Sequence, residues 1–130
     1  MYNSNFSSDT PSKADLLNNI GNIFLNQGKL DEALDKYQAA FLIYKNFFGE
    51  ERKHLSIADV LNNIANVYYR KLQYDDALKK YQESLLLYTE LLPASNGGCM
   101  HPSHADLLNN IGNILFDQGK FDKHFFEFLD

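Results

Sequence analysis

The chain has 130 residues, of which 45% are hydrophobic and 22% are charged, and its formal net charge is −5. This composition is ordinary for a folded domain and argues against disorder, while an acidic balance without a Lys/Arg block argues against a nucleic-acid partner. No apolar run approaches the roughly 18 to 20 residues that span a bilayer, so we expect no membrane partner.

Three near-identical stretches organise the chain. They occupy residues 14–23, 58–67 and 105–114, and each contains a Leu-Asn-Asn-Ile or Val-Leu-Asn-Asn-Ile core. They begin 44 and then 47 residues apart, a spacing that indicates stacked supersecondary units rather than one globular core. The sequence therefore predicts a repeat protein whose function lies on the surface that stacking creates.

Residues 1–10 precede the first stretch, and we expect them to form a short disordered lead. They have neither the basic start nor the apolar segment of a secretory signal. The single cysteine, Cys99, cannot form an internal disulfide, which fits a reducing compartment. The predicted location is cytoplasmic.

A serine stands near the start of each unit, with an aspartate three positions later. The pairs are Ser12 and Asp15, Ser56 and Asp59, and Ser103 and Asp106. Such a pair lets the hydroxyl cap a free amide while the carboxylate sits at the positive end of the helix. We therefore expect helices to begin near residues 12, 56 and 103, with the aspartates acting as caps rather than as ligand contacts.

Within each unit, apolar residues recur at steps of three and four, which indicates a pair of helices. In the first unit the first helix ends at Gly28 and the second runs from about Leu30 to Phe48, ending at Gly49. The second unit has its second helix at about 74–92, and the third leaves only residues 120–130 for one. Four tyrosines have the spacing of residues that pack between helices, with hydroxyls reaching solvent: Tyr37, Tyr44, Tyr81 and Tyr88.

The order of large, small and aromatic residues resembles the tetratricopeptide repeat. The residues that carry the resemblance are Leu17, Ile20, Gly21, Phe24, Gly28, Ala33 and Tyr37 in the first unit, and Leu61, Ile64, Ala65, Tyr68, Ala77 and Tyr81 in the second. Leucine replaces the signature tryptophan. The long period and the Leu-Asn-Asn-Ile box, with His101-Pro102-Ser103 ahead of its last copy, look like the longer repeats of kinesin light chains.

This resemblance covers residues 11 to about 123 and implies an all-α fold. The expected architecture is a right-handed superhelix of antiparallel helical hairpins, an α-α solenoid with about two and a half to three repeats. Repeat 1 would span 11–55, repeat 2 would span 56–102, and a truncated repeat 3 would span 103–130. The resemblance further implies that the first helices line a concave groove, and that such grooves bind peptide segments of other proteins.

The third repeat departs from this pattern at His124, where the other two have Ala33 and Ala77. Its last residues are rich in phenylalanine and would leave an apolar surface partly uncovered. We therefore expect the chain to self-associate through its C-terminal end.

Carboxamides recur in register on the first helices and define a candidate peptide-binding strip. Each amide offers the donor and the acceptor that an extended peptide backbone needs. Apolar residues at the edge of the strip would form side-chain pockets, and the strip carries one cation. The predicted peptide-binding residues are Asn18, Asn22, Leu25, Asn62, Asn66, Tyr69, Arg70, Asn109, Asn113 and Phe116. The alternative is that these amides only bond connector backbone between repeats.

Motifs for catalysis are lacking in the sequence: it has no phosphate-binding glycine loop, dinucleotide-binding loop or zinc-protease motif. Cys99, His101 and His104 could approach a metal, but they offer three ligands in a Gly-rich connector. We expect no enzyme activity, no cofactor and no metal. The predicted function is that of an adaptor or scaffold that binds a protein or peptide ligand. The alternative is a structural solenoid fragment that self-associates or caps a longer repeat array.

Overall fold

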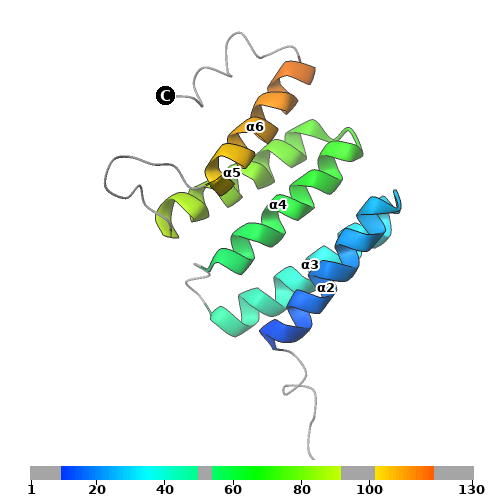
Figure 1. Cartoon of the computed structure of the whole chain (residues 1–130), viewed down its shortest axis with the longest axis vertical. Coiled ribbons are helices and arrows are strands. Elements are labelled where there is room, and N and C mark those ends of the chain that lie inside the picture. The colour runs from blue at the N-terminus through cyan, green and yellow to red at the C-terminus, as the bar shows by residue number, and fades with distance from the viewer. Residues whose placement is uncertain (1–9, 50–53, 92–101, 119–130) are drawn as a thin grey trace, which may run out of the picture.

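The computed structural model describes residues 10–49, 54–91 and 102–118, and this part of the chain contains five helices and no strand. The helices are α2 (Pro11–Asn26), α3 (Leu30–Phe48), α4 (Leu55–Arg70), α5 (Tyr74–Leu91) and α6 (Pro102–Asp117). Helices α2 and α3 form one antiparallel hairpin, α4 and α5 form the next, and α6 packs beyond them (Figure 1). The predicted all-α solenoid of stacked helical hairpins is confirmed.

Several sequence predictions concern residues outside this described part. They are the lead at residues 1–9, the connector with Cys99 and His101, and the C-terminal stretch that includes His124. Among the described helices, none is both long and apolar enough to cross a membrane.

The helices begin within one residue of the predicted positions, but the predicted serine caps are wrong. Ser12, Ser56 and Ser103 all lie inside their helices. Thr10 caps α2 by accepting a hydrogen bond from a first-turn amide at 3.4 Å, and the His54 side chain caps α4 at 3.1 Å. Proline at the first helical position explains the shift in α2, because Pro11 has a preset φ and no N–H to satisfy, so the cap falls on the preceding residue.

Helices α2 and α4 end in the same backbone motif. After α2, Gly28 has φ 78° and the Lys29 amide donates to the Phe24 carbonyl at 2.9 Å. After α4, Leu72 has φ 65° and the Gln73 amide makes the corresponding 2.9 Å bond. These are the bonds of a Schellman cap, which needs a left-handed residue just past the helix. The prediction that Gly28 ends α2 is confirmed, as is the α3 range that ends before Gly49.

The core of each hairpin forms where a tyrosine ring lies against a small residue of the first helix. Tyr37 and Tyr81 are fully or almost fully buried, which confirms that they pack between helices. A Cβ atom built on Gly21 would lie 2.7 Å from Cε1 of Tyr37, so the helix and the ring meet there at a distance that only glycine allows. The second hairpin has Ala65 at the corresponding position, where it is fully buried.

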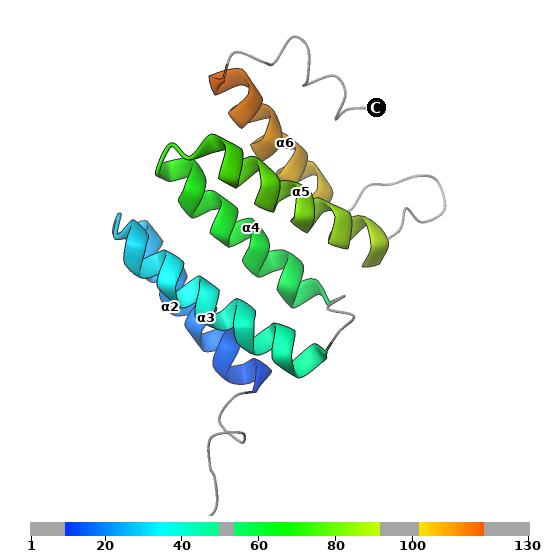
Figure 2. The same ribbon diagram turned by 180° about the vertical axis from the view of Figure 1, so that it is seen from behind.

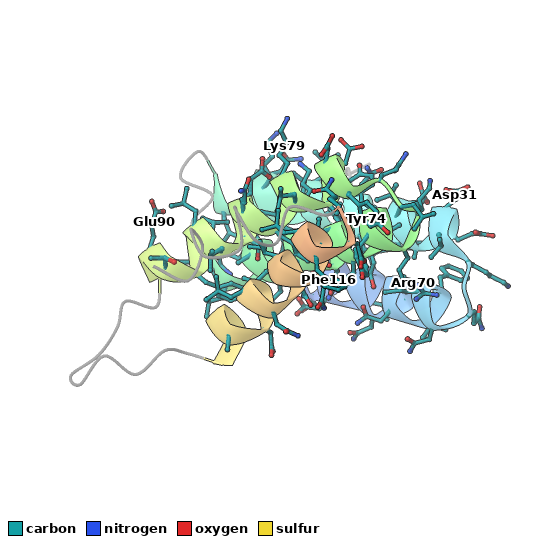
Figure 3. All side chains as sticks on the ribbon, turned by 90° about the horizontal axis from the view of Figure 1, so that it is seen from above. Asp31, Arg70, Tyr74, Lys79, Glu90 and Phe116 are labelled. Atoms are coloured by element: carbon teal, nitrogen blue, oxygen red, sulfur yellow. The ribbon has the colours of Figure 1, made fainter. Side chains whose placement is uncertain are left out.

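Successive hairpins join through the second helix of one and the first helix of the next: α3 packs on α4, and α5 packs on α6 (Figures 1 and 2). Figure 3 shows α2 and α6 on one side of the stack and α3 and α5 on the other. The first helices therefore share one side of the molecule, and the candidate strip lies along them.

Candidate functional site

In each hairpin two buried tyrosines of the second helix donate hydrogen bonds to polar residues of the first helix. The pairs are Tyr37 to Asn22 and Tyr44 to Asp15 in the first hairpin, and Tyr81 to Asn66 and Tyr88 to Asp59 in the second. The prediction that these hydroxyls reach solvent is therefore wrong, because a buried hydroxyl requires a partner. The prediction that Asp15, Asp59 and Asp106 are helix caps is also wrong, since none of them lies in the first turn of its helix and Thr10 and His54 provide the caps of α2 and α4.

Burial raises the pKa of three of these tyrosine hydroxyls and so keeps them protonated. Burial raises the pKa of Tyr37 to about 12, and burial also raises the pKa of Tyr81. The pKa of Tyr44 is raised first by burial and then by its hydrogen bond to Asp15. A protonated hydroxyl donates to the amide oxygen of Asn22 or Asn66, which leaves the amide nitrogen as the group that can face a ligand. The side chains of Asn22 and Asn66 thus present amide donors to a ligand, rather than a donor and an acceptor each.

The carboxamides at the other predicted position, Asn18, Asn62 and Asn109, have a different environment in each repeat. The Asn18 amide oxygen accepts from the Asn63 amide nitrogen at 2.9 Å, across the boundary between the first two hairpins. The corresponding oxygen of Asn62 is buried and has no hydrogen-bond partner within the described residues. Asn109 is exposed. At the boundary between the first two hairpins, therefore, a strip residue bonds between repeats, but its partner is a side chain of α4 and not the connector backbone of the alternative interpretation.

A hollow of about 210 Å³ lies where α2, α4 and α6 converge. Its lining consists of Leu25, Asn66, Tyr69, Arg70, Tyr81, Asn110 and Asn113. The structure thus brings together Leu25, Asn66, Tyr69, Arg70 and Asn113 from the predicted strip. It does not place Asn18, Asn22, Asn62, Asn109 or Phe116 in the lining. The lining also contains Tyr81 and Asn110, which the predicted peptide-binding residues did not include. Tyr81 follows Asn66 at the same spacing as Tyr37 follows Asn22.

The polar groups of this hollow are held in place by contacts between hairpins. The Arg70 guanidinium donates to the Leu25 carbonyl at 3.1 Å, at the end of α2. The Tyr69 hydroxyl donates to Asp117 at 2.9 Å, and this bond raises the pKa of Tyr69. Figure 3 shows Arg70 and Phe116 on the side of the first helices, opposite Lys79. The result is a small site with apolar walls and several fixed N–H donors.

A second, acidic hollow of about 390 Å³ is lined by Phe24, Asp31, Glu32, Asp35 and Lys36. It contains none of the predicted strip residues, and its Asp31 already accepts from Lys71 at 2.6 Å. Among the described residues, no cluster of three or more His, Cys, Asp or Glu side chains is arranged to hold a metal. The hollow beneath the strip is therefore the stronger candidate.

The tetratricopeptide repeat profile matches residues 12–90 and 56–123, so the chain belongs to the tetratricopeptide repeat family. Its fold is similar to that of BtubC (BKLC) from P. vanneervenii, with a TM-score of 0.76 and 23% identity over 89% of this chain and 44% of that one. It is also similar to a putative kinesin light chain with nearly identical TPR-like repeats from Podosopora anserina, with a TM-score of 0.71 and 16% identity over 87% of this chain and 50% of the other.

The fold is thus that of the kinesin-light-chain-like repeats that the sequence resembles. The chain spans about half the length of these two structures. No curated protein gives a significant match.

Proposed function

We propose that this chain binds a peptide segment of a partner protein on the side formed by its first helices, with the 210 Å³ hollow as the anchor point. A tetratricopeptide fold supports a role in protein–protein interaction or scaffolding in general. The observation that carries the finer proposal is the convergence of side chains from three successive first helices on one small hollow. Five of the side chains that line the hollow are among the peptide-binding residues predicted from the sequence repeats.

The lining favours a ligand with hydrogen-bond acceptors beside an apolar group. Asn66 has its amide oxygen engaged by Tyr81, so it faces the hollow as a donor, and Arg70 adds a guanidinium at the rim. Leu25 and Tyr69 supply apolar surface. The volume is below the roughly 300 to 1,000 Å³ of small-molecule pockets, which suits one anchoring side chain with main-chain carbonyls on either side.

On this proposal the chain is a non-enzymatic adaptor or scaffold of the cytoplasm, with protein ligands and with neither nucleic acid nor membrane as partner. The acidic net charge and the single cysteine support that assignment.

Selection from a random peptide library displayed on phage, followed by calorimetry with the selected peptides, tests the site. The variant is Asn113→Lys, since Asn113 lines the hollow and is exposed, so its replacement leaves the fold intact. The control is Asn46→Lys, an exposed asparagine on α3 that is absent from the lining. We expect at least about tenfold weaker binding, about 1.4 kcal/mol, for the first variant only. Equal binding by both variants would contradict the proposed site.

A structural role is the second candidate, in which copies of the chain associate through the C-terminal end. The observation that favours it is Phe116, whose side chain is 64% exposed near the end of α6. The residues at the corresponding positions of the first two hairpins, Leu25 and Tyr69, are only partly exposed. An exposed aromatic side chain of this size favours association.

A further inference from the structure

The two boundaries between hairpins treat the same pair of asparagine positions differently. At the first boundary, the Asn63 amide nitrogen of α4 donates to the Asn18 oxygen of α2 at 2.9 Å. The residues at the corresponding positions of the second boundary are Asn110 of α6, as the donor, and Asn62 of α4, as the acceptor. The chain therefore contains an internal standard that shows how this pair bonds when it is closed.

At the second boundary the pair is open. The Asn62 amide oxygen is buried without a hydrogen-bond partner, and Asn110 makes no hydrogen bond within the described residues. The other buried side-chain oxygen without a partner in the described part of the chain belongs to Gln118, which lies at the same boundary and donates to Asp75 of α5. A buried acceptor left unpaired is unfavourable, so the open pair needs a physical reason.

The side chain of Asn110 lines the 210 Å³ hollow, together with Asn66 of α4 and Asn113 of α6. The Asn66 oxygen is engaged by Tyr81, so Asn66 offers its amide nitrogen to the hollow. The amide nitrogen of Asn110 is not engaged by any group in the described part of the chain. An acceptor in the hollow can therefore receive N–H groups from α4 and from α6 at once.

Repeat position alone does not explain why Asn110 is open. Asn63 and Asn110 stand at the same position, and both are partly buried. Asn63 is tied to Asn18 and is absent from the lining of the hollow, whereas Asn110 is untied and belongs to the lining. The amide that closes the first boundary is thus kept for the hollow at the second. An unpaired buried group is tolerated where it serves a site rather than the fold.

We propose that Asn110 is a ligand-binding residue of the hollow, and that it donates, together with Asn66, to a main-chain carbonyl of the partner segment. The inference rests on the proposed function and adds to it a residue that the predicted strip lacks. The carbonyl must be free of hydrogen bonds within its own segment, because the carbonyls inside a helix are already bonded. The hollow therefore selects a segment that is extended, or that ends a helix, at the contact point.

The first part of the test uses the free chain and thermal melting followed by circular dichroism. Asn18→Ala and Asn63→Ala each remove one partner of the closed pair, whereas Asn62→Ala and Asn110→Ala each remove one partner of the open pair. All four asparagines are partly buried within helices, so the gain in helix propensity is similar. We expect the first two variants to melt about 4 °C below the second two. Equal melting temperatures for all four would overturn the inference, because the two boundaries would then be alike.

The second part of the test measures binding of the phage-selected peptides to the full chain by calorimetry. We expect Asn110→Ala to weaken binding at least about tenfold, and Asn63→Ala, its matched control, to bind within about twofold of wild type. Peptides weakened by Asn113→Lys but not by Asn110→Ala would overturn this inference alone. Peptides insensitive to both changes would overturn the proposed site as well, and a library without any binding peptide would overturn the proposed function.

The carbonyl is tested on the side of the ligand. In a series of analogues of one selected peptide, each peptide bond in turn carries a thioamide, whose sulfur is a weaker acceptor than oxygen. We expect one position at which the thioamide weakens binding to the wild-type chain but not to Asn110→Ala, as a double-mutant cycle requires for two groups in contact. The absence of any such position would overturn the assignment of a main-chain carbonyl to Asn110.

Discussion

The two complete hairpins, α2–α3 and α4–α5, satisfy the same polar contacts with different packing residues. Both bury two tyrosines, and each tyrosine donates to an asparagine or an aspartate at the same sequence separation. Their differences include three matched positions in the packing and at the helix ends: Gly21 against Ala65, Ala40 against Ser84, and Gly28 against Leu72. The tyrosine contacts thus define the hairpin, while the three differences show which parts of it can vary.

The largest effect expected from this comparison is a loss of stability in alkali, because both hairpins depend on protonated tyrosines. The pKa of Tyr37 is raised from 10.0 to about 12, and those of Tyr44 and Tyr81 are also raised. A raised pKa in the folded state means that its stabilising contribution is complete below pH 10 and declines as pH rises toward the folded value. In that range, each such tyrosine lowers the free energy of unfolding by up to about 1.4 kcal/mol per pH unit.

Urea unfolding at several pH values between 10 and 12 measures this decline, with unfolding followed by circular dichroism. The Tyr37→Phe variant should show a shallower decline, since the phenylalanine side chain cannot ionise. A free energy of unfolding that stays constant across this range in the wild-type chain would show that the tyrosine contacts do not stabilise the hairpins.

The second effect concerns the close approach in the first hairpin. Gly21→Ala adds a methyl group 2.7 Å from the Tyr37 ring, so we expect a loss of about 1 to 3 kcal/mol from overpacking despite the better helix propensity of alanine. The reverse change, Ala65→Gly, should cost about 1 kcal/mol, mainly in propensity. Urea unfolding of both variants tests the difference. A stabilising Gly21→Ala would mean that the Tyr37 ring relaxes freely.

Local patterns in the sequence were sufficient to predict the helices and several of their ends. The period of apolar residues and the left-handed preference of glycine act over a few residues, so the α3 range and the role of Gly28 followed directly. Leu72 carried no such signal, because nothing in its side chain favours a positive φ. The cap of α2 was missed because Pro11 moves it to Thr10.

The candidate site could be predicted only in part, because hydrogen-bond partners depend on how helices are set against each other. The strip residues Leu25, Asn66 and Arg70 converge as side chains on one face should. The engagement of Asn66 by Tyr81 depends on the distance between α4 and α5, and that of Asn18 by Asn63 depends on the distance between α2 and α4. Neither distance is encoded in the spacing along one helix.

The third effect comes from a buried hydroxyl that only the second hairpin has. Ser84 is fully buried and donates to the Ala58 carbonyl at 2.6 Å, between α5 and α4. Ser84→Ala should cost about 1 kcal/mol of unfolding free energy, and no more, since Ala40 closes the first hairpin without a hydroxyl. Thr89→Ala is the control, because its hydroxyl makes an exposed bond within α5. Equal losses from the two changes would contradict the role of burial.

The smallest effect concerns the left-handed residue after α4, and it has the opposite sign. A left-handed backbone costs roughly 1 to 2 kcal/mol for an L-residue, while glycine adds about 0.4 to 1 kcal/mol of unfolded-state entropy. The Leu72 side chain is exposed, so its removal loses little packing. Leu72→Gly should therefore stabilise the chain by about 0.5 kcal/mol or slightly more.

Gly28→Ala is the matched reverse change, because an added Cβ at Gly28 would have no atom within 4 Å and only the backbone angle is tested. We expect it to lower the free energy of unfolding by about as much as Leu72→Gly raises it. Thermal melting of the two variants and of the double variant measures both. If Leu72→Gly lowered the melting temperature, the Leu72 side chain would have to be stabilising the α4–α5 turn through contacts that outweigh its backbone strain.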